Sequence, residues 1–484
     1  MYIKLNNTFV VRNEKNCSFL VPKQNLLDNN LSKNSVIPMP PFIGFIFANI
    51  GNKEYAQSRK YIAKSLGVNE NSINIFVNKL LNSKEKELKL HNETYICFPE
   101  NILVESKEQE KRLFITTSDF NPTDDFIIHR PNIPLNLNFM ITTKCTTNCI
   151  YCYAQRNLGK DLTTTEVLGI IETARNIGVV NISLTGGDIF AREDWREILS
   201  KIKECEYDSF LSTKTPLSNE NIEFLYSIGF NKWQFSLDTI DVQHLNKLVA
   251  VKEDYIRNVD QMLYHCDKIG VKIAIRSVLT KINSSINEIK DLYKLLKKHS
   301  CIMEWSITPA FFSEFKSDYK SYEVSNADLV DVFNFKNFTK SPFPIFLNKI
   351  GSDGYKLKRH SSVEEFVSKN TRCYANVYIM SILATGECTV CEMLYKNPEL
   401  LLGDLKINTL QEVWNSPKAL NIYMPKQNEL DQEKPCYTCK VFDKCKRHFD
   451  KRICYADIAK VYKKNILSTP DPRCPIAPNV EYIL

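Results

Sequence analysis

Apolar and polar positions alternate with two different periods between about residue 135 and residue 309. Short apolar stretches rich in β-branched residues are separated by longer stretches with helical spacing, such as residues 164–177 and 286–297. Alternating strands and helices predict an α/β fold, in which right-handed crossovers join the strands of a parallel sheet. The six expected strands are 137–141, 179–184, 209–213, 232–237, 271–279 and 302–308.

The first 125 residues have a different pattern. Two strand patterns, 8–11 and 18–21, precede three helical patterns at 41–50, 54–66 and 72–81, and a further strand is expected near 93–98. In the last helix, apolar residues recur at helical spacing and form one stripe. Two strands, three helices and a closing strand are typical of a winged helix-turn-helix domain. Such domains often bind DNA, but the last helix, NSINIFVNKLLNSK, carries only two lysines, which does not favour that role.

Two irregular stretches separate the patterned regions. Residues 100–134 are charged and contain prolines, which indicates a linker, and residues 341–369 read as a second connection. We therefore expect three domains, at 1–125, 134–340 and 371–484.

Composition narrows the class of protein. The chain has 484 residues, of which 43% are apolar and 25% charged, so a folded protein of several domains is expected rather than a disordered or fibrous one. The longest apolar run, 42–48, is far shorter than the roughly 20 residues that cross a bilayer. The start, MYIKLNNTFV, does not resemble a secretory signal, so we expect a cytoplasmic protein. A net charge of +7 neither requires nor excludes an anionic partner.

The 16 cysteines are the unusual feature. In a reducing compartment, clustered cysteines more often bind metal or do redox chemistry than form disulfides. Five are isolated and are interpreted as small buried side chains: Cys17, Cys97, Cys205, Cys266 and Cys301. The other eleven fall into two regions, one within KCTTNCIYCYA and one after residue 370.

The first region holds Cys145, Cys149 and Cys152 in the spacing C-x3-C-x2-C, with no histidine nearby. Structural zinc takes four ligands, so three thiolates suit it poorly. A 4Fe–4S cluster suits them better, because three irons can be ligated while the fourth stays open. About 35 residues further, a strand pattern ends in Gly186, Gly187 and Asp188. Glycines let a backbone approach a ligand closely, although a lone Gly-Gly-Asp would equally suit an ordinary turn.

Together these motifs, with Tyr151 before the third cysteine, resemble the radical S-adenosylmethionine (SAM) superfamily. The resemblance implies a partial (β/α)6 TIM-like barrel, SAM as cofactor, and a 4Fe–4S cluster on the three cysteines. Gly-Gly-Asp looks like the family's Gly-Gly-Glu motif, which holds the methionine amino group. Asp188 replaces the commoner Glu and Ile189 a frequent Pro. We treat both departures as minor because backbone groups do much of that binding.

Barrel chemistry sits at the carboxyl ends of strands, which places further candidate SAM contacts. The resemblance implies that a serine near the end of the fourth strand and an arginine on the fifth bind ribose and the methionine carboxylate. An ordinary core or salt-bridge role is the alternative for each single residue. The candidate cofactor-binding set is Tyr151, Gly186, Gly187, Asp188, Ser212, Ser236, Asp238 and Arg276. No catalytic acid or base is assigned.

The second cysteine region contains C-x2-C pairs at 388–391 and 436–439, which alone would suit zinc. Behind a radical SAM barrel, it resembles the SPASM extension, which carries two auxiliary 4Fe–4S clusters and would bring the total to three. A cysteine is expected near position 449, where the chain has Phe449, so an insertion would make Cys454 the corresponding ligand. If Cys388 or Cys454 does not bind, the first auxiliary cluster has an open iron. The resemblance implies Cys373, Cys388, Cys391 and Cys454 for the first cluster, and Cys436, Cys439, Cys445 and Cys474 for the second.

The order of N-terminal elements resembles the peptide-recognition domain of ribosomal-peptide maturases, where a leader peptide adds a strand to a sheet edge. A purely structural role is the alternative for this domain. Our hypothesis is a radical SAM/SPASM peptide maturase that crosslinks a precursor peptide through a 5′-deoxyadenosyl radical, with a thioether as first choice and a carbon–carbon bond second. Expected partners are the precursor, bound through its leader, and an electron donor such as flavodoxin or ferredoxin, with no nucleic acid or membrane. The alternatives are a SPASM enzyme that oxidises a residue in a folded protein, like the sulfatase maturases, and a zinc-containing DNA-binding regulator.

Overall fold

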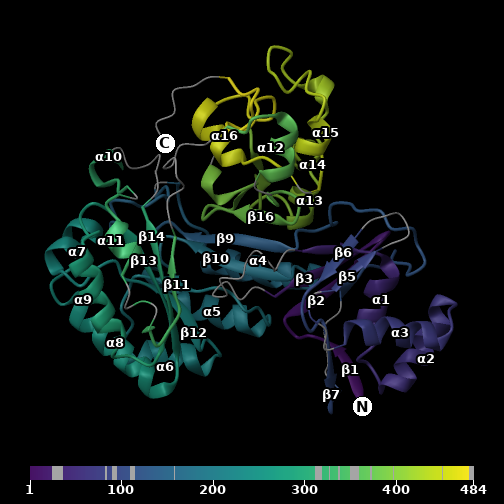
Figure 1. Cartoon of the computed structure of the whole chain (residues 1–484), viewed down its shortest axis with the longest axis horizontal. Helices are drawn as coiled ribbons and strands as arrows, with labels where there is room; N and C mark the ends of the chain where they lie inside the picture. Colours follow the sequence, from purple (N-terminus) through teal and green to yellow (C-terminus); the bar gives the residue numbers. More distant parts are fainter. Residues whose placement is uncertain are drawn as a thin grey trace. The chain divides into compact units, whose positions relative to one another are not determined.

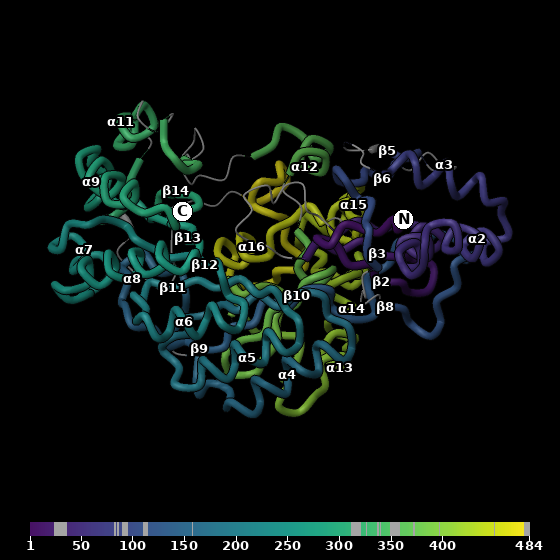
Figure 2. The backbone as a smooth tube through the Cα atoms, turned by 90° about the horizontal axis from the view of Figure 1, so that it is seen from below, coloured from purple at the N-terminus to yellow at the C-terminus, as the bar shows by residue number. Residues whose placement is uncertain are grey.

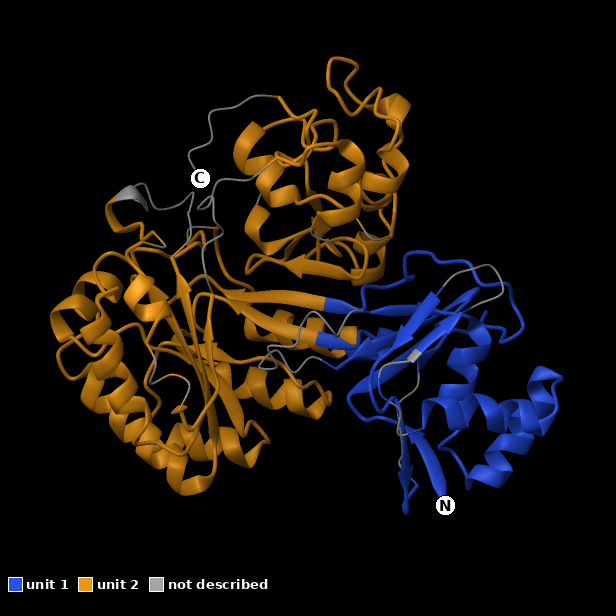
Figure 3. Cartoon of the chain, in the orientation of Figure 1, with its two compact units in different colours: residues 1–136, 175–181 blue, residues 137–174, 182–484 orange. Residues whose placement is uncertain are grey.

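The computed structural model shows the chain as two compact units (Figures 1 and 3). Unit 1 comprises residues 1–136 and 175–181, and unit 2 comprises residues 137–174 and 182–484. The three domain boundaries predicted from the sequence stay a prediction. The structure describes residues 1–23, 36–81, 84, 86–89, 95–109, 115–156, 158–310, 319–325, 327–335, 338, 340–348, 359–370, 373–395, 397–449 and 451–478.

Unit 1 contains a four-stranded sheet in the order β4-β3-β2-β8. Strands β2 (Phe9–Glu14) and β3 (Cys17–Pro22) form an antiparallel hairpin, as the two N-terminal strand patterns predict. Strand β4 (Ile37–Met39) pairs antiparallel with β3, and β8 (Ile115–Thr116) pairs parallel with β2. A separate pair joins β1 (Tyr2–Leu5) to β7 (Leu103–Ser106).

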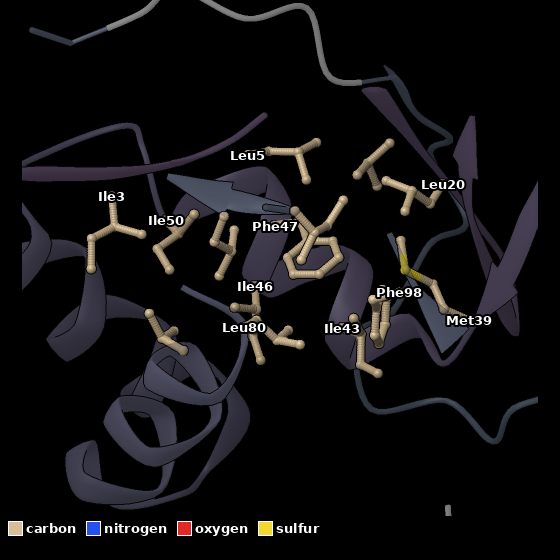
Figure 4. Packing of buried hydrophobic residues seen from close by; sticks show 14 of the residues in the cluster. Ile3, Leu5, Leu20, Met39, Ile43, Ile46, Phe47, Ile50, Leu80 and Phe98 are labelled. Carbon is tan, nitrogen blue, oxygen red and sulfur yellow. The ribbon is translucent and has the colours of Figure 1, made fainter. Parts of the chain in front are cut away.

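The three predicted helices of unit 1 are present as α1 (Pro41–Asn49), α2 (Tyr55–Leu66) and α3 (Glu70–Leu80). A hairpin of β5 (Lys86–Lys89) and β6 (Tyr95–Phe98) follows; residues 93 and 94 of the predicted strand lie outside the described residues. The apolar face of α3 is buried with Phe47 of α1 and Phe98 of β6 (Figure 4). The assignment of these elements as a winged helix-turn-helix domain stays a prediction.

Residues 175–181 belong to unit 1 because buried polar groups hold them there. The Arg12 guanidinium is paired with Glu14 and donates to the carbonyl of Gly178 at 3.3 Å. The Asn181 amide donates to the Pro22 carbonyl at 2.9 Å. Within unit 1, these hydrogen bonds connect residues 175–181 to the N-terminal sheet.

All six strands that the sequence predicts between residues 135 and 309 are present, and they lie in unit 2 except for the first residue of β9 and of β10. Parallel strands β11 to β14 are followed by a seventh strand, β15, which pairs parallel with β14. Strands β9 and β10 belong to a second sheet. The strands are β9 (Asn136–Thr142), β10 (Asn181–Gly186), β11 (Ser212–Thr213), β12 (Lys232–Ser236), β13 (Lys272–Leu279), β14 (Ile302–Pro309) and β15 (Ile345–Leu347).

Helices alternate with these strands and cover the outer face of β11 to β14 (Figures 1 and 2). Helices α8 (Tyr255–Ile269) and α9 (Ile286–Leu296) each bury one apolar face, because apolar residues recur in them at three- and four-residue spacing. The predicted α/β fold is confirmed. The helices are α4 (Thr164–Ile177), α5 (Trp195–Glu204), α6 (Asn219–Ser227), α7 (Val242–Val249), α8 (Tyr255–Ile269), α9 (Ile286–Leu296), α10 (Tyr319–Tyr322) and α11 (Val330–Phe333).

The C-terminal region shares a sheet with the start of the barrel. Strands β16 (Ile379–Ile382), β17 (Glu387–Thr389) and β18 (Leu401–Asp404) extend it in the order β10-β9-β16-β17-β18. The remaining helices are α12 (Val363–Lys369), α13 (Leu410–Trp414), α14 (Pro417–Tyr423), α15 (Phe442–Lys446) and α16 (Tyr455–Tyr462). Among the described residues, no helix is long and apolar enough to cross a bilayer.

Candidate functional site

A cavity of about 340 Å³ lies at the carboxyl ends of the barrel strands of unit 2. Most of the predicted site residues of the barrel line it, whereas Asp238 and Arg276 are not among its lining residues. The predicted lining residues are Cys145, Cys149, Cys152, Tyr151, Gly186, Gly187, Asp188, Ser212 and Ser236. The rule that barrel chemistry collects at this end of the strands therefore placed most of them together.

The loop with the three cysteines follows β9 and is held by backbone hydrogen bonds. The amide of Asn148 donates to the Val249 carbonyl at 3.0 Å, at the end of α7 (Val242–Val249). The Thr147 hydroxyl lies between two thiols, 3.3 Å from Cys145 Sγ and 3.5 Å from Cys149 Sγ. Burial raises the pKa of Cys149, and the charge of Lys214 opposes that rise.

The donor set suits an iron–sulfur cluster. Three soft sulfur donors face one cavity, which is the chemistry that such a cluster requires. Within the described part of the chain, no three His, Cys, Asp or Glu side chains converge as ligands of a single metal ion. The cavity also offers hydroxyl and backbone groups to a second, polar ligand.

The two glycines allow the turn after β10 to pack against the cysteine loop. A Cβ on Gly187 would lie 1.8 Å from the Lys144 carbonyl oxygen, and one on Gly186 would lie 2.3 Å from the Thr142 carbonyl oxygen. The amide of Gly187 donates to that Thr142 carbonyl at 2.8 Å. The sequence suggested glycines for close approach to a ligand; in the structure they also permit close approach of two backbone segments.

The Asp188 carboxylate is committed to neighbouring protein groups. It accepts the hydroxyls of Thr213 at 2.7 Å and Thr215 at 2.9 Å, and it caps the short helix that begins at Ile189. It therefore positions the end of β11, where Ser212 and the following residue Lys214 line the cavity.

A buried ion pair between Lys214 and Asp238 borders the cavity and was missed by the sequence analysis, which named only Asp238. Lys214 Nζ lies 2.9 Å from Asp238 Oδ2, and the Tyr151 hydroxyl donates to the same carboxylate. Burial disfavours the charged form of Lys214, but Asp238 and the nearby thiols of Cys149 and Cys145 together outweigh it, so the pKa of the ammonium is raised. A lysine directly after a barrel strand is the signal that could have found it.

The two predicted serines and the arginine behave differently. The Gln234 amide donates to Ser212 Oγ at 2.9 Å and to Ser236 Oγ at 3.2 Å, and both serines face the cavity. Arg276 instead forms an ion pair with Glu304 on the neighbouring strand β14. Its predicted role as a SAM contact stays a prediction.

The C-terminal cysteines form two groups in unit 2. One group, Cys436, Cys439, Cys445 and Cys474, corresponds to the second predicted cluster. Burial raises the pKa of Cys445, and the other three thiols of the group add to the rise because they lie close to it. Burial likewise raises the pKa of Cys474 to about 11, with Cys436 and Cys439 contributing.

The other group, Cys373, Cys391 and Cys454, corresponds to the first predicted cluster. Burial raises the pKa values of Cys391 and Cys454 to about 12, and the nearby Cys373 contributes to both. Cys388 stands apart from this group. It is fully buried on β17, its thiol lies 3.9 Å from the Gly386 carbonyl, and burial and Asp404 raise its pKa. Its predicted role as a fourth ligand stays a prediction.

A buried polar group joins the barrel cavity to the C-terminal region. The Tyr395 hydroxyl donates to the carbonyl of Tyr153 at 3.2 Å, and Tyr153 lines the cavity. Tyr395 has a φ of 43°, a conformation that a tyrosine rarely adopts. Burial raises the pKa of neighbouring Glu392. Nothing in the local sequence indicates this arrangement, because it depends on segments 242 residues apart.

Comparison with known proteins agrees with this geometry. Residues 139–296 match the radical SAM superfamily, and residues 373–440 match the SPASM iron–sulfur cluster-binding domain. A probable GTP 3',8-cyclase of Pyrobaculum aerophilum is 24% identical over 163 residues, which are 33% of this chain and 53% of that protein. The chain thus spans about half the length of this curated relative.

Solved structures of SuiB from Streptococcus suis have the same fold. SuiB bound to its precursor peptide SuiA aligns over 98% of this chain and 100% of that chain, with a TM-score of 0.61 and 16% identity. SuiB bound to S-adenosylmethionine aligns over the same shares, with a TM-score of 0.58.

The match of residues 139–296 to the radical SAM superfamily and the cysteine-lined cavity in that region identify a radical SAM enzyme. This chain carries a radical SAM domain and a C-terminal SPASM domain, and it has the fold of the SuiB structures. The resemblance drawn from Cys145, Cys149, Cys152 and the C-terminal cysteines is confirmed, and the zinc-containing regulator is set aside. An enzyme with these two domains uses SAM and iron–sulfur clusters.

Proposed function

We propose that the protein is a maturase that installs a crosslink in a ribosomally made precursor peptide. A thioether is the first choice and a carbon–carbon bond the second. The observation that carries the proposal is the presence of three separate groups of thiols in one unit, the first of them in the barrel cavity. The likeness to SuiB, which extends over 98% of this chain and includes a complex with a precursor peptide, supports it.

In this proposal Cys145, Cys149 and Cys152 hold one 4Fe–4S cluster and the rest of the cavity holds SAM. Together the two cofactors supply a 5′-deoxyadenosyl radical that abstracts hydrogen from an unreactive carbon. Ser212 and Ser236 offer hydroxyls to the ribose. Lys214 offers its ammonium to the methionine carboxylate and is better placed for this than Arg276, because it lines the cavity. Apolar residues around them, among them Leu184, exclude water.

The two C-terminal groups hold the auxiliary clusters, which gives three clusters in all. The second auxiliary cluster has four ligands, from Cys436, Cys439, Cys445 and Cys474. The first has three, from Cys373, Cys391 and Cys454, and the position of Cys388 favours an open iron in this first cluster. Such an iron could accept a thiolate of the substrate, and the clusters would carry away the second electron of a crosslink.

Unit 1 would bind the leader of the precursor. Among the described strands, β4 (Ile37–Met39) is at the edge of its four-stranded sheet, and peptides bind to sheet edges by adding a strand. Pro38 in this strand has no amide hydrogen and therefore cannot donate to another strand. The electron that begins each cycle would come from a flavodoxin or a ferredoxin.

The test uses the reconstituted enzyme, SAM, a reductant and the peptide encoded by a short cysteine-containing reading frame beside the gene. We expect a mass loss of roughly 2 Da per crosslink, because two hydrogens leave, and no change with a Cys145→Ala/Cys149→Ala/Cys152→Ala variant. An unchanged mass for every neighbouring precursor would overturn the proposal. Oxidation of a residue in a folded protein instead would support the sulfatase-maturase-like alternative.

A further inference from the structure

Lys446 is a buried cation that the proposed chemistry does not use. It is the last residue of α15 (Phe442–Lys446), and its relative exposure is 1%. Its ammonium donates to the carbonyls of Leu467 at 2.6 Å and Thr469 at 2.7 Å. Neither acceptor carries a formal charge, and no carboxylate among the described residues forms an ion pair with it.

Thiols of the four-cysteine group lie close to Lys446, and a second buried lysine, Lys451, donates to the Lys446 carbonyl. Lys446 follows Cys445 directly, and Leu467, whose carbonyl accepts from the Lys446 ammonium, packs in one cluster with Cys436 and Cys439. Burial raises the pKa values of Cys436 and Cys445, and the Lys446 charge opposes the rise in each. The Cys436 thiol has apolar surroundings, because Cys436 packs with Leu430 and Phe442.

A buried charge is costly unless an opposite charge lies nearby. Four thiolates around a 4Fe–4S core give a net negative group, and one-electron reduction adds one more negative charge. In a buried, apolar site this attraction is much stronger than in water. The ammonium therefore has a partner once a cluster is bound, and its attraction is greater for the reduced cluster.

We propose that Lys446 is the built-in counter-charge of the cluster held by Cys436, Cys439, Cys445 and Cys474, and that it makes this cluster easier to reduce. The inference rests on the proposed ligation of a cluster by these cysteines. Reduction transfers one electron from the electron donor to the cluster, and no bond forms or breaks. The potential of an iron–sulfur cluster depends on such nearby charge.

The test compares Lys446→Gln with Lys444→Gln in the full chain. Both changes remove one positive charge from α15, but Lys444 is exposed and its charge is screened by water.

Both variants are made in a Cys145→Ala/Cys149→Ala/Cys152→Ala background, which leaves the two auxiliary clusters. Reduction is followed by electron paramagnetic resonance. We compare the variants at the potential where the cluster held by the four-cysteine group is half reduced in the parent protein. At that potential, Lys446→Gln should lower the ratio of reduced to oxidised cluster at least tenfold for this cluster and leave the other auxiliary cluster unchanged. That ratio corresponds to 59 mV for a one-electron couple. Lys444→Gln should change it little, and equal shifts in the two variants would overturn the inference.

Iron content separates this inference from the ligation on which it rests. A parent background holding about four irons per chain rather than about eight would contradict the ligation itself. If Lys446→Gln loses iron while Lys446→Arg retains it, the charge is needed to hold the cluster, which supports the inference. If Lys446→Arg also loses iron, the lysine acts only by holding the two carbonyls, and the inference is overturned.

Discussion

Lys214 Nζ lies 2.9 Å from Asp238 Oδ2 at the edge of the cavity that the three barrel cysteines line. Lys214 comes directly after β11 and Asp238 comes two residues after β12, so the pair joins two neighbouring parallel strands. Asp238 Oδ1 accepts the Val278 amide at 2.9 Å, which ties in the next strand, β13. One carboxylate therefore orients a cation, a tyrosine and a strand end around the cavity.

Breaking this ion pair is expected to destabilise unit 2. Asp238→Asn leaves the buried Lys214 ammonium without its counter-charge, which costs about 3–5 kcal/mol in comparable buried pairs. The double variant Lys214→Met/Asp238→Asn should recover part of this loss. The free energy of unfolding from denaturant titration measures both. Asp291→Asn, which breaks an exposed pair with Lys294, is the control and should cost about 1 kcal/mol or less.

The Lys214 charge is also expected to contribute to SAM binding. Lys214→Met should raise the dissociation constant for SAM at least tenfold, or about 1.4 kcal/mol, because it removes the cation that faces the cavity. Lys214→Arg should retain most of the affinity. Calorimetric titration of the reconstituted, oxidised enzyme measures it, and equal affinities for the Met variant and the parent would exclude this role.

Gly187 should tolerate no side chain. A Cβ there would lie 1.8 Å from the Lys144 carbonyl, so Gly187→Ala must displace the cysteine loop. We expect the variant to lose the iron bound by Cys145, Cys149 and Cys152 or to fail to fold. Gly169→Ala is the matched control, because Gly169 lies in α4 with open space where its Cβ would be. It should retain iron and gain up to about 1 kcal/mol of stability.

The sequence predicted the features that are local. The six barrel strands could be found because buried parallel strands are short apolar runs, and Cys145, Cys149 and Cys152 because they share one loop. Strand β15 was missed because three half-buried residues leave no pattern. The pairing of Arg276 with Glu304 could not be seen either, because it depends on how two distant strands align. The same is true of the contact between Tyr395 and Tyr153.

Acid is expected to weaken unit 2 through Asp194. Arg192 hydrogen-bonds this carboxylate and lowers its pKa, and the same guanidinium donates to the Ile141 carbonyl of β9 at 2.7 Å. Because the pKa of Asp194 is lower in the folded state than in the unfolded state, its ionised carboxylate stabilises the fold. This stabilisation is fully present above the pKa of the unfolded state, about 3.9, and is lost as the pH falls through the pKa of the folded state. The stability difference between the parent and Asp194→Asn should therefore be constant above about pH 5 and shrink below about pH 4. Denaturation curves across this range measure it, and a difference that does not change with pH would contradict the assignment.

Iron analysis should distinguish Cys388 from Cys454. Cys454 and Cys391 each lie near Cys373, whereas Cys388 is fully buried on β17 beside the Gly386 carbonyl. We therefore expect Cys388→Ala to retain about 12 irons per chain and Cys454→Ala to retain about 8. Cys266→Ala, which changes a buried cysteine of α8 outside both groups, is the control for the loss of a buried thiol. Equal iron loss in Cys388→Ala and Cys454→Ala would show that Cys388 is the fourth ligand. Retention of iron in Cys388→Ala would leave the first auxiliary cluster with three cysteine ligands and an iron free to bind a thiolate of the precursor.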